Sequence, residues 1–292
     1  MSIQKQIMVG MVGAGKSSFI AALYHVVESG EVTSSLQLSE LSDDRKYLVE
    51  IRNKWLGCVE FDRTKLGKEQ VLTLKLKEPL SQRIIDLVLP DVSGETFRDQ
   101  WEHRRTTKVF DVLAQESDGM LLFIHPDTVT DSVRINKMKE VASVLDDEDD
   151  VEEEAATPIS QKVDWHPSFA PTQVKLVEIL QFLMREPHLY PIKRIAVIVS
   201  AWDIIKYEYD TPSAWISKRL PLLDQFLKTR RDAVNYKCFG ISAQGGRLGE
   251  DNSVLLSKVC QSERIEVVTD EEGEFDIHDI TAPIKWLMKD GE

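Results

Sequence analysis

The chain has 292 residues, enough for one large domain or two small ones. Its composition, 42% hydrophobic and 29% charged, is typical of soluble globular proteins, and no apolar run approaches the roughly 20 residues that a membrane span needs. The first residues lead directly into a strand-like segment without the organisation of a signal peptide. Three scattered cysteines lack metal-ligand spacing, so we expect a cytoplasmic protein with reduced thiols.

The formal net charge is −13, and eight acidic residues between Asp146 and Glu154 supply −8 of it. Such a run of like charges repels itself and cannot be buried, so a solvated, disordered loop is expected around residues 145–158. The alternative is a docking site for a basic partner. The chain has no basic stripe, which argues against nucleic-acid binding.

Apolar patterns predict the elements of the first half of the chain. Residues 3–10 indicate a strand, and an apolar helix follows it up to Gly30. A charged helix is expected over about 40–56, with Leu41, Leu48, Ile51 and Trp55 on one face. The alternating segment 70–77 and the more continuously apolar 83–91 are joined too closely for a crossover, so they should pair antiparallel.

The second half alternates helices with buried strands. Helices are expected at about 95–115, 172–185, 212–230 and 281–289, and strands at 119–126, 192–203 and 236–242. This alternation predicts an α/β fold with a mostly parallel, doubly wound sheet and one antiparallel edge strand. We expect residues 1–292 to form a single domain, with insertions at about 30–60 and 127–170.

The segment from Gly10 to Ser17, GMVGAGKS, matches the phosphate-binding pattern G-x-x-x-x-G-K-[ST] in full, between a predicted strand and a predicted helix. Its glycines let successive backbone N–H groups turn toward an anion, and the helix adds the positive end of its dipole. Lys16 should reach the β- and γ-phosphates, and the Ser17 hydroxyl should ligate Mg²⁺. The residues expected to bind the phosphates are Gly10, Gly13, Ala14, Gly15, Lys16, Ser17 and Ser18.

Three further segments resemble motifs of the Ras-like P-loop GTPases, each at the end of a predicted strand. Asp91-Val92-Ser93-Gly94 resembles D-x-x-G, in which the acid holds Mg²⁺ through water and the glycine N–H senses the γ-phosphate. Ser200-Ala201-Trp202-Asp203 stands where N-K-x-D is found, and only the aspartate is kept. Ser242-Ala243-Gln244 resembles the S-A-K loop, whose backbone N–H meets guanine O6.

The resemblance implies a guanine site. Asp203 would accept from the guanine N1–H and amino group, Ser242 and Ala243 would belong to the base loop, and Trp202 or its neighbours would supply the stacking that the missing lysine stem gives in the family.

The resemblance also implies catalytic residues. Thr64 is our choice for the threonine that binds Mg²⁺ beside the γ-phosphate, and Thr33 is the alternative. Glu95 follows Gly94 where Ras-like proteins carry a water-orienting glutamine, and a carboxylate there is repelled by the γ-phosphate. We therefore expect slow GTP hydrolysis. The arginines Arg98, Arg104 and Arg105 are interpreted as solvated helix charges, with a catalytic role as the alternative.

The two insertions, together with the segments DVSGE, SAWD, PTQVKLVEIL and APIKWLM, resemble the bacterial double-GTPase (DO-GTPase) families. Those families imply a protein effector or a second GTPase as partner, in predicted anti-phage systems. The resemblance implies a GTP-binding switch that uses GTP, GDP and Mg²⁺. A P-loop ATPase or nucleotide kinase and a nucleotide-locked pseudo-GTPase scaffold are the alternatives.

Overall fold

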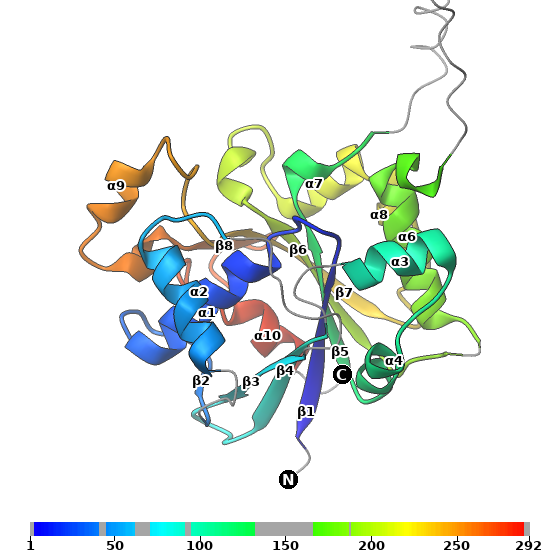
Figure 1. Ribbon diagram of the computed structural model, residues 1–292, viewed down its shortest axis with the longest axis horizontal. Helices are drawn as coiled ribbons and strands as arrows, with labels where there is room; N and C mark the ends of the chain where they lie inside the picture. The colour runs from blue at the N-terminus through cyan, green and yellow to red at the C-terminus, as the bar shows by residue number, and fades with distance from the viewer. Residues whose placement is uncertain are drawn as a thin grey trace, which may run out of the picture.

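The computed structural model describes residues 3–40, 45–61, 71–90, 95–131, 166–186 and 188–288. Within these residues, eight strands form one sheet in the order β2-β3-β4-β1-β5-β6-β7-β8 (Figure 1). The strands are β1 (Gln4–Gly10), β2 (Gln37–Leu38), β3 (Leu72–Lys77), β4 (Ile84–Leu89), β5 (Gly119–Ile124), β6 (Arg194–Ser200), β7 (Asn235–Ser242) and β8 (Glu266–Thr269).

The five central strands β4, β1, β5, β6 and β7 are parallel to one another. The predicted α/β fold with a mostly parallel sheet is confirmed. The predicted pairing of β3 with β4 is antiparallel as expected, because only the short segment 78–83 connects them. The expectation of one antiparallel edge strand is too simple, because β2 extends that edge and β8 adds an antiparallel strand at the other.

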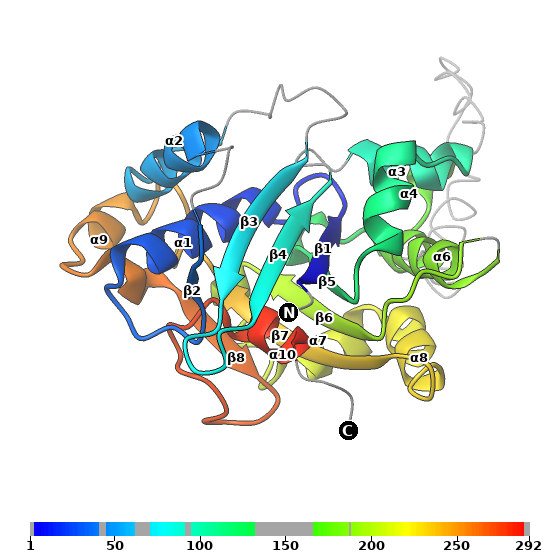
Figure 2. The ribbon, with the colours of Figure 1, turned by 90° about the horizontal axis from the view of Figure 1, so that it is seen from below.

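Helices cover both faces of the sheet (Figure 2). Successive strand residues point to opposite faces, so Met8 of β1 packs in one core cluster while Ile7 and Val9 pack in the other. The first cluster holds buried residues of α1 (Lys16–Ser29), α2 (Arg45–Leu56) and α10 (Ala282–Leu287). The second holds those of α3 (Glu95–His103), α4 (Lys108–Gln115), α6 (Thr172–Met184), α7 (Pro212–Arg219) and α8 (Pro221–Thr229).

Two helices expected to be continuous are each divided in two. The segment 95–115 breaks after α3 because Arg104 has a φ of 56°, and Thr107 then caps α4 by accepting from the Phe110 N–H. The segment 212–230 breaks at Leu220 because Pro221, which lacks an N–H, begins α8. Helix α2 begins at Arg45 and buries Leu48, Ile51 and Trp55, as its apolar stripe predicts.

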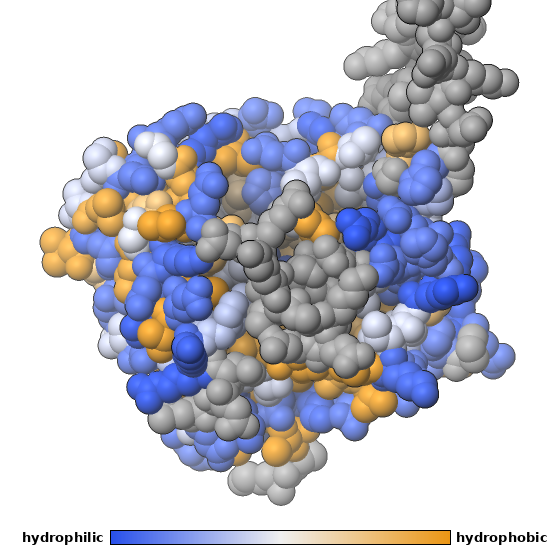
Figure 3. All heavy atoms as spheres, in the orientation of Figure 1, coloured by the Kyte–Doolittle hydropathy of each residue, from blue (hydrophilic) through white to orange (hydrophobic). Residues whose placement is uncertain are grey.

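Leu41 and the acidic run lie outside the described residues. Within them, no helix has the length and apolarity to cross a bilayer. The surface in Figure 3 is mostly polar, and apolar residues gather toward the end that carries α9 (Asn252–Leu256). In and just after α9, the side chains of Val254, Leu256 and Val259 are exposed.

Neighbouring leucines of α8 test this packing. Leu223 is fully buried in the second cluster, so Leu223→Ala should lower the free energy of unfolding by about 2–5 kcal/mol, through lost burial and a residual cavity. Leu222 is 40% exposed on the same helix, and Leu222→Ala should cost less than about 1 kcal/mol. Urea unfolding of both variants measures the difference, and equal losses would contradict this packing of α8.

Candidate functional site

The glycine-rich loop between β1 and α1 has backbone geometry that suits an anion. Gly13 and Gly15 have φ values of 75° and 89°, in the left-handed region that glycine tolerates best. The Lys16 ammonium lies 2.6 Å from the Gly10 carbonyl oxygen and 3.0 Å from that of Met11, so it is held over the loop. The first amides of α1 have no acceptors within the helix, so this helix end favours an anion.

Ser200, at the end of β6, connects this loop to the sheet by hydrogen bonding. Its Oγ lies 2.9 Å from the Ala14 carbonyl oxygen and 3.2 Å from that of Ile124, at the end of β5. A Cβ on Gly15 would come within 2.7 Å of the same Oγ, so no residue with a side chain can replace Gly15 without moving Ser200. The serine that replaces the asparagine of N-K-x-D therefore joins three segments.

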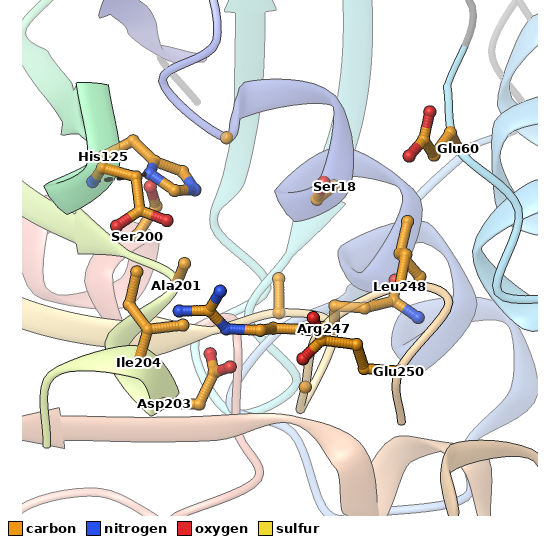
Figure 4. A pocket seen from close by; sticks show the side chains of 15 residues that line it. Ser18, Glu60, His125, Ser200, Ala201, Asp203, Ile204, Arg247, Leu248 and Glu250 are labelled. Atoms are coloured by element: carbon orange, nitrogen blue, oxygen red, sulfur yellow. Dashed lines mark hydrogen bonds between the residues drawn. The ribbon is translucent and has the colours of Figure 1, made fainter. Parts of the chain in front are cut away.

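A cavity of about 370 Å³ opens beside this loop, where β5, β6 and β7 end (Figure 4). Ligand sites of open α/β sheets lie at the carboxyl ends of the strands. The lining residues are Gly15, Ser18, Glu60, His125, Asp127, Ser200, Ala201, Asp203, Ile204, Ala243, Gln244, Gly246, Arg247, Leu248 and Glu250.

Asp203 presents a fixed carboxylate to this cavity. Its Oδ1 accepts from the Ser242 hydroxyl at 2.6 Å, and the Ser242 oxygen accepts from the Gly245 N–H at 3.1 Å. Ser242 is buried, so this bond is shielded from water. The loop after β6 is further held by Lys206, whose ammonium lies 2.5 Å from the Glu266 carboxylate in β8. That hydrogen bond raises the pKa of Lys206.

His125 follows β5 and lines the cavity. Its Nδ1 accepts from the Asp127 N–H at 3.2 Å, which places the proton of the neutral ring on Nε2. Figure 4 shows the imidazole pointing into the cavity. Burial lowers the pKa of His125, although the nearby carboxylates of Asp127 and Asp203 act to raise it. The ring therefore offers the cavity a neutral N–H donor.

Trp202 does not line the cavity, so the expected stacking role for this residue is not supported by its position. Its ring is buried against Gly240 of β7, where an added Cβ would lie 2.5 Å from the Trp202 Cδ2. The residue before it, Ala201, has a φ of 47° and lines the cavity instead.

The described residues include only some of the predicted site residues. Thr64, Asp91 and Gly94 lie outside the described residues, and of Glu95 only its place as the first residue of α3 is described. The alternative Thr33 is exposed before β2 and does not line the cavity. Arg104, interpreted from the sequence as a solvated helix charge, forms an ion pair with Glu178 and lies over the Trp101 ring.

Sequence reasoning missed several lining residues on two loops. Glu60 follows α2, and Arg247, Leu248 and Glu250 belong to the loop after β7. In Figure 4 the Arg247 side chain extends from this loop in the direction of Asp203. The glycine pair after the S-A-Q segment, which includes Gly245 at a φ of 86°, is the sequence signal of a tight loop here.

A family model described as Double-GTPase 1 matches residues 7–287, nearly the whole chain. The chain belongs to this family. The resemblance to the double-GTPases is thereby confirmed. No curated protein matches the chain.

Solved structures similar to this chain include an elongation factor and a GTPase-like domain. A bacterial selenocysteine-specific elongation factor EF-Sec is 13% identical, with a TM-score of 0.37 over 87% of this chain and 28% of that one. The Saccharomyces cerevisiae Ski7 GTPase-like domain is 12% identical when bound to GDP and inorganic phosphate, with a TM-score of 0.42 over 99% and 51% of the two chains. Bound to GTP, it is 14% identical, with a TM-score of 0.36 over 83% and 43%. This Double-GTPase 1 chain thus spans about half or less of the length of each.

The protonation of His125 gives a pH test of this geometry. An unfolded histidine titrates at about 6.5, and the folded site holds the pKa lower, so the unfolded state binds more protons as pH falls. The contribution of His125 to stability is full above pH 6.5 and is lost as pH falls toward the lower folded pKa. His125→Asn keeps an acceptor for the Asp127 N–H but does not titrate. It should therefore lose less unfolding free energy than the wild type between pH 7 and pH 5.

Urea unfolding at the two pH values measures this loss. His103→Asn is the matched control, because His103 is exposed at the end of α3. It should follow the wild type. Identical losses in His125→Asn and the wild type would contradict the half-buried, neutral imidazole.

Proposed function

We propose that this chain binds GTP and GDP in the cavity at the carboxyl ends of β5, β6 and β7, hydrolyses GTP slowly, and acts as a nucleotide-dependent switch. The observation that carries the proposal is that the Asp203 carboxylate and the phosphate-binding loop line one cavity. The family description adds independent support for a GTPase.

The phosphate end of the proposed site is the turn from Gly10 to Ser18. The positive φ values of Gly13 and Gly15 let the backbone N–H groups of the loop face an anion, and the first turn of α1 continues the series. Lys16 already lies over the loop and supplies a positive charge for the β- and γ-phosphates.

The base end consists of Asp203 and the loop after β7. Guanine carries adjacent N1–H and amino donors, which a carboxylate can accept together, whereas adenine presents an acceptor at N1. Ser242 holds the Asp203 oxygen and the Gly245 N–H together, so the carboxylate and the Ala243 backbone keep a fixed separation. A site with a buried polar group arranged for one base discriminates against a base that leaves that group unpaired.

Mg²⁺ fits the hydroxyl of Ser17, which is half-buried at the start of α1, next to Lys16. With Thr64 and Asp91, this hydroxyl would hold the ion, which neutralises charge on the β- and γ-phosphates when bound. Gly94 would donate its N–H to the γ-phosphate. Glu95 would accept a hydrogen bond from the attacking water, but its charge opposes the approach to the phosphate, which is the reason for slow turnover.

The switch and partner parts of the proposal rest on the family membership. A second GTPase or a protein effector would bind one nucleotide state in preference to the other. A role in anti-phage defence would follow from such a partner. Comparing binding of a candidate partner to the GDP form and to the form loaded with a non-hydrolysable GTP analogue tests this part.

A competition titration tests the nucleotide. Labelled GDP bound to purified protein with Mg²⁺ is displaced by GTP, GDP, ATP and ADP, and guanine nucleotides should compete at least about 100-fold better, because the wrong base leaves Asp203 unpaired. Asp203→Asn should weaken the binding of GDP and strengthen the binding of xanthosine diphosphate, because the Asn amide can donate to the xanthine O2. Asp127→Asn, which changes another cavity-lining aspartate, is the matched control and should keep the guanine preference.

Equal or better displacement by adenine nucleotides would contradict the guanine site and favour the ATPase alternative. Tight GDP and GTP binding without measurable turnover, even with a partner present, would favour the nucleotide-locked scaffold.

Glu95 gives a separate test of the hydrolysis step. Glu95→Gln removes a negative charge beside the γ-phosphate but keeps an acceptor for water. Single-turnover phosphate release should therefore become at least about tenfold faster, which corresponds to an activation free energy lower by about 1.4 kcal/mol. GDP affinity should not change. An unchanged or slower rate would contradict the assigned role of Glu95.

A further inference from the structure

Helix α2 lies in the segment that the sequence predicts to be an insertion. It is hydrogen-bonded directly to the loop that begins at Ala243 after β7, the base loop of the proposed site. The Trp55 indole N–H donates to the Ala243 carbonyl oxygen at 2.8 Å, across 188 residues of sequence. Trp55 is fully buried and Ala243 nearly so. A buried backbone carbonyl beyond the end of a strand needs such a partner, and here a side chain from α2 provides it.

This hydrogen bond fixes the orientation of one peptide group in the proposed base site. The carbonyl of Ala243 and the N–H of Gln244 belong to the same planar trans peptide and therefore point in opposite directions. With the carbonyl directed at the indole, the Gln244 N–H points away from Trp55. Ala243 and Gln244 both line the cavity, whereas Trp55 does not.

Two side chains, those of Arg264 and His25, contact Trp55. The guanidinium of Arg264 lies 4.0 Å from its ring centroid and donates to the Trp55 carbonyl oxygen at 3.1 Å. The His25 ring lies 5.1 Å from the Trp55 ring, and His25 Nε2 is 3.2 Å from the Glu31 carboxylate. The indole therefore has little freedom to follow a shift of the base loop.

The turn after α2 makes a second connection to the same loop. Cys58 has a φ of 51°, and its sulfur accepts from Arg264 Nη1 at 3.0 Å and lies 3.5 Å from Gln244 Nε2. The Cys58 carbonyl oxygen is 3.4 Å from Asn252 Nδ2. Two residues further on, Glu60 lines the cavity. Helix α2 and the turn after it thus contact two adjacent residues of the base loop. Trp55 bonds to the backbone of Ala243, and Cys58 contacts the side chain of Gln244.

We propose that Trp55 is a positioning residue for base recognition: its indole N–H sets the plane of the Ala243–Gln244 peptide, so that the backbone donors of this loop meet the purine O6. This inference rests on the proposed guanine site and assigns to α2 a part in its specificity. Trp55 acts through the loop and does not touch the base.

Trp55→Phe tests the inference because it keeps an aromatic ring and removes the N–H. Affinity is measured for GDP, for inosine diphosphate, which keeps O6, and for the diphosphate of 2-aminopurine riboside, which lacks O6. GDP and inosine diphosphate should each weaken about tenfold, the size of one hydrogen bond left unmade. The 2-aminopurine nucleotide has no O6 to lose, so its affinity should change less than about twofold.

Trp101→Phe is the matched control. The Trp101 indole also donates to a backbone carbonyl, that of Pro167 at 2.6 Å, and neither residue lines the cavity. It should leave all three affinities unchanged. If Trp55→Phe does not fold, as a melting curve would reveal, replacing Trp55 with β-(3-benzothienyl)alanine keeps the ring shape without the N–H, and the same three titrations apply.

An equal weakening of all three nucleotides, or no change in GDP affinity, would overturn the positioning role while leaving the guanine site intact. A wild-type protein that binds GDP no better than ADP would instead contradict the proposed function, and this inference with it.

Discussion

The hydrogen bond between Ser242 and Asp203 joins the two loops that form one end of the cavity. The hydroxyl of Ser242 lies 2.6 Å from the carboxylate and also accepts from the Gly245 N–H. A buried side chain at the end of β7 therefore fixes the position of the Asp203 carboxylate, which follows β6. Ser200, at the end of β6, connects that strand to the glycine loop through the Ala14 carbonyl. The two serines hold the proposed base and phosphate ends at a constant separation.

This arrangement depends on the parallel centre of the sheet, because the ends of β5, β6 and β7 lie at one edge and bring loops from distant parts of the chain together. Helix α2 then packs against α1 and reaches the base loop through Trp55. The segment predicted from the sequence to be an insertion therefore contacts a loop that lines the cavity. Arg264 and His25 both contact the same indole.

Local patterns in the sequence predict the central strands, the β3–β4 hairpin and the glycine turn, because each depends on residues close together in the chain. The break at Arg104 is harder to predict, since a helical pattern continues across it. Pro221 is itself a sequence signal for the second break, and the apolar periodicity on either side of it leads to the prediction of one helix. Strand β8 is short, and it pairs with β7 only after the chain has formed α9 and a further turn. The burial of Trp202 on Gly240 and the bond from Trp55 to Ala243 depend on tertiary contacts, which no local pattern reveals.

The most direct test of the central claim is a crystal structure of the protein with GDP and Mg²⁺, in which the distances from the purine N1 and amino nitrogen to the Asp203 carboxylate are measured. Both distances should be about 2.7–3.2 Å, the range of N–H···O hydrogen bonds, with the diphosphate at the start of α1. A base bound away from Asp203, or a diphosphate bound away from the turn between Gly10 and Ser17, would contradict it.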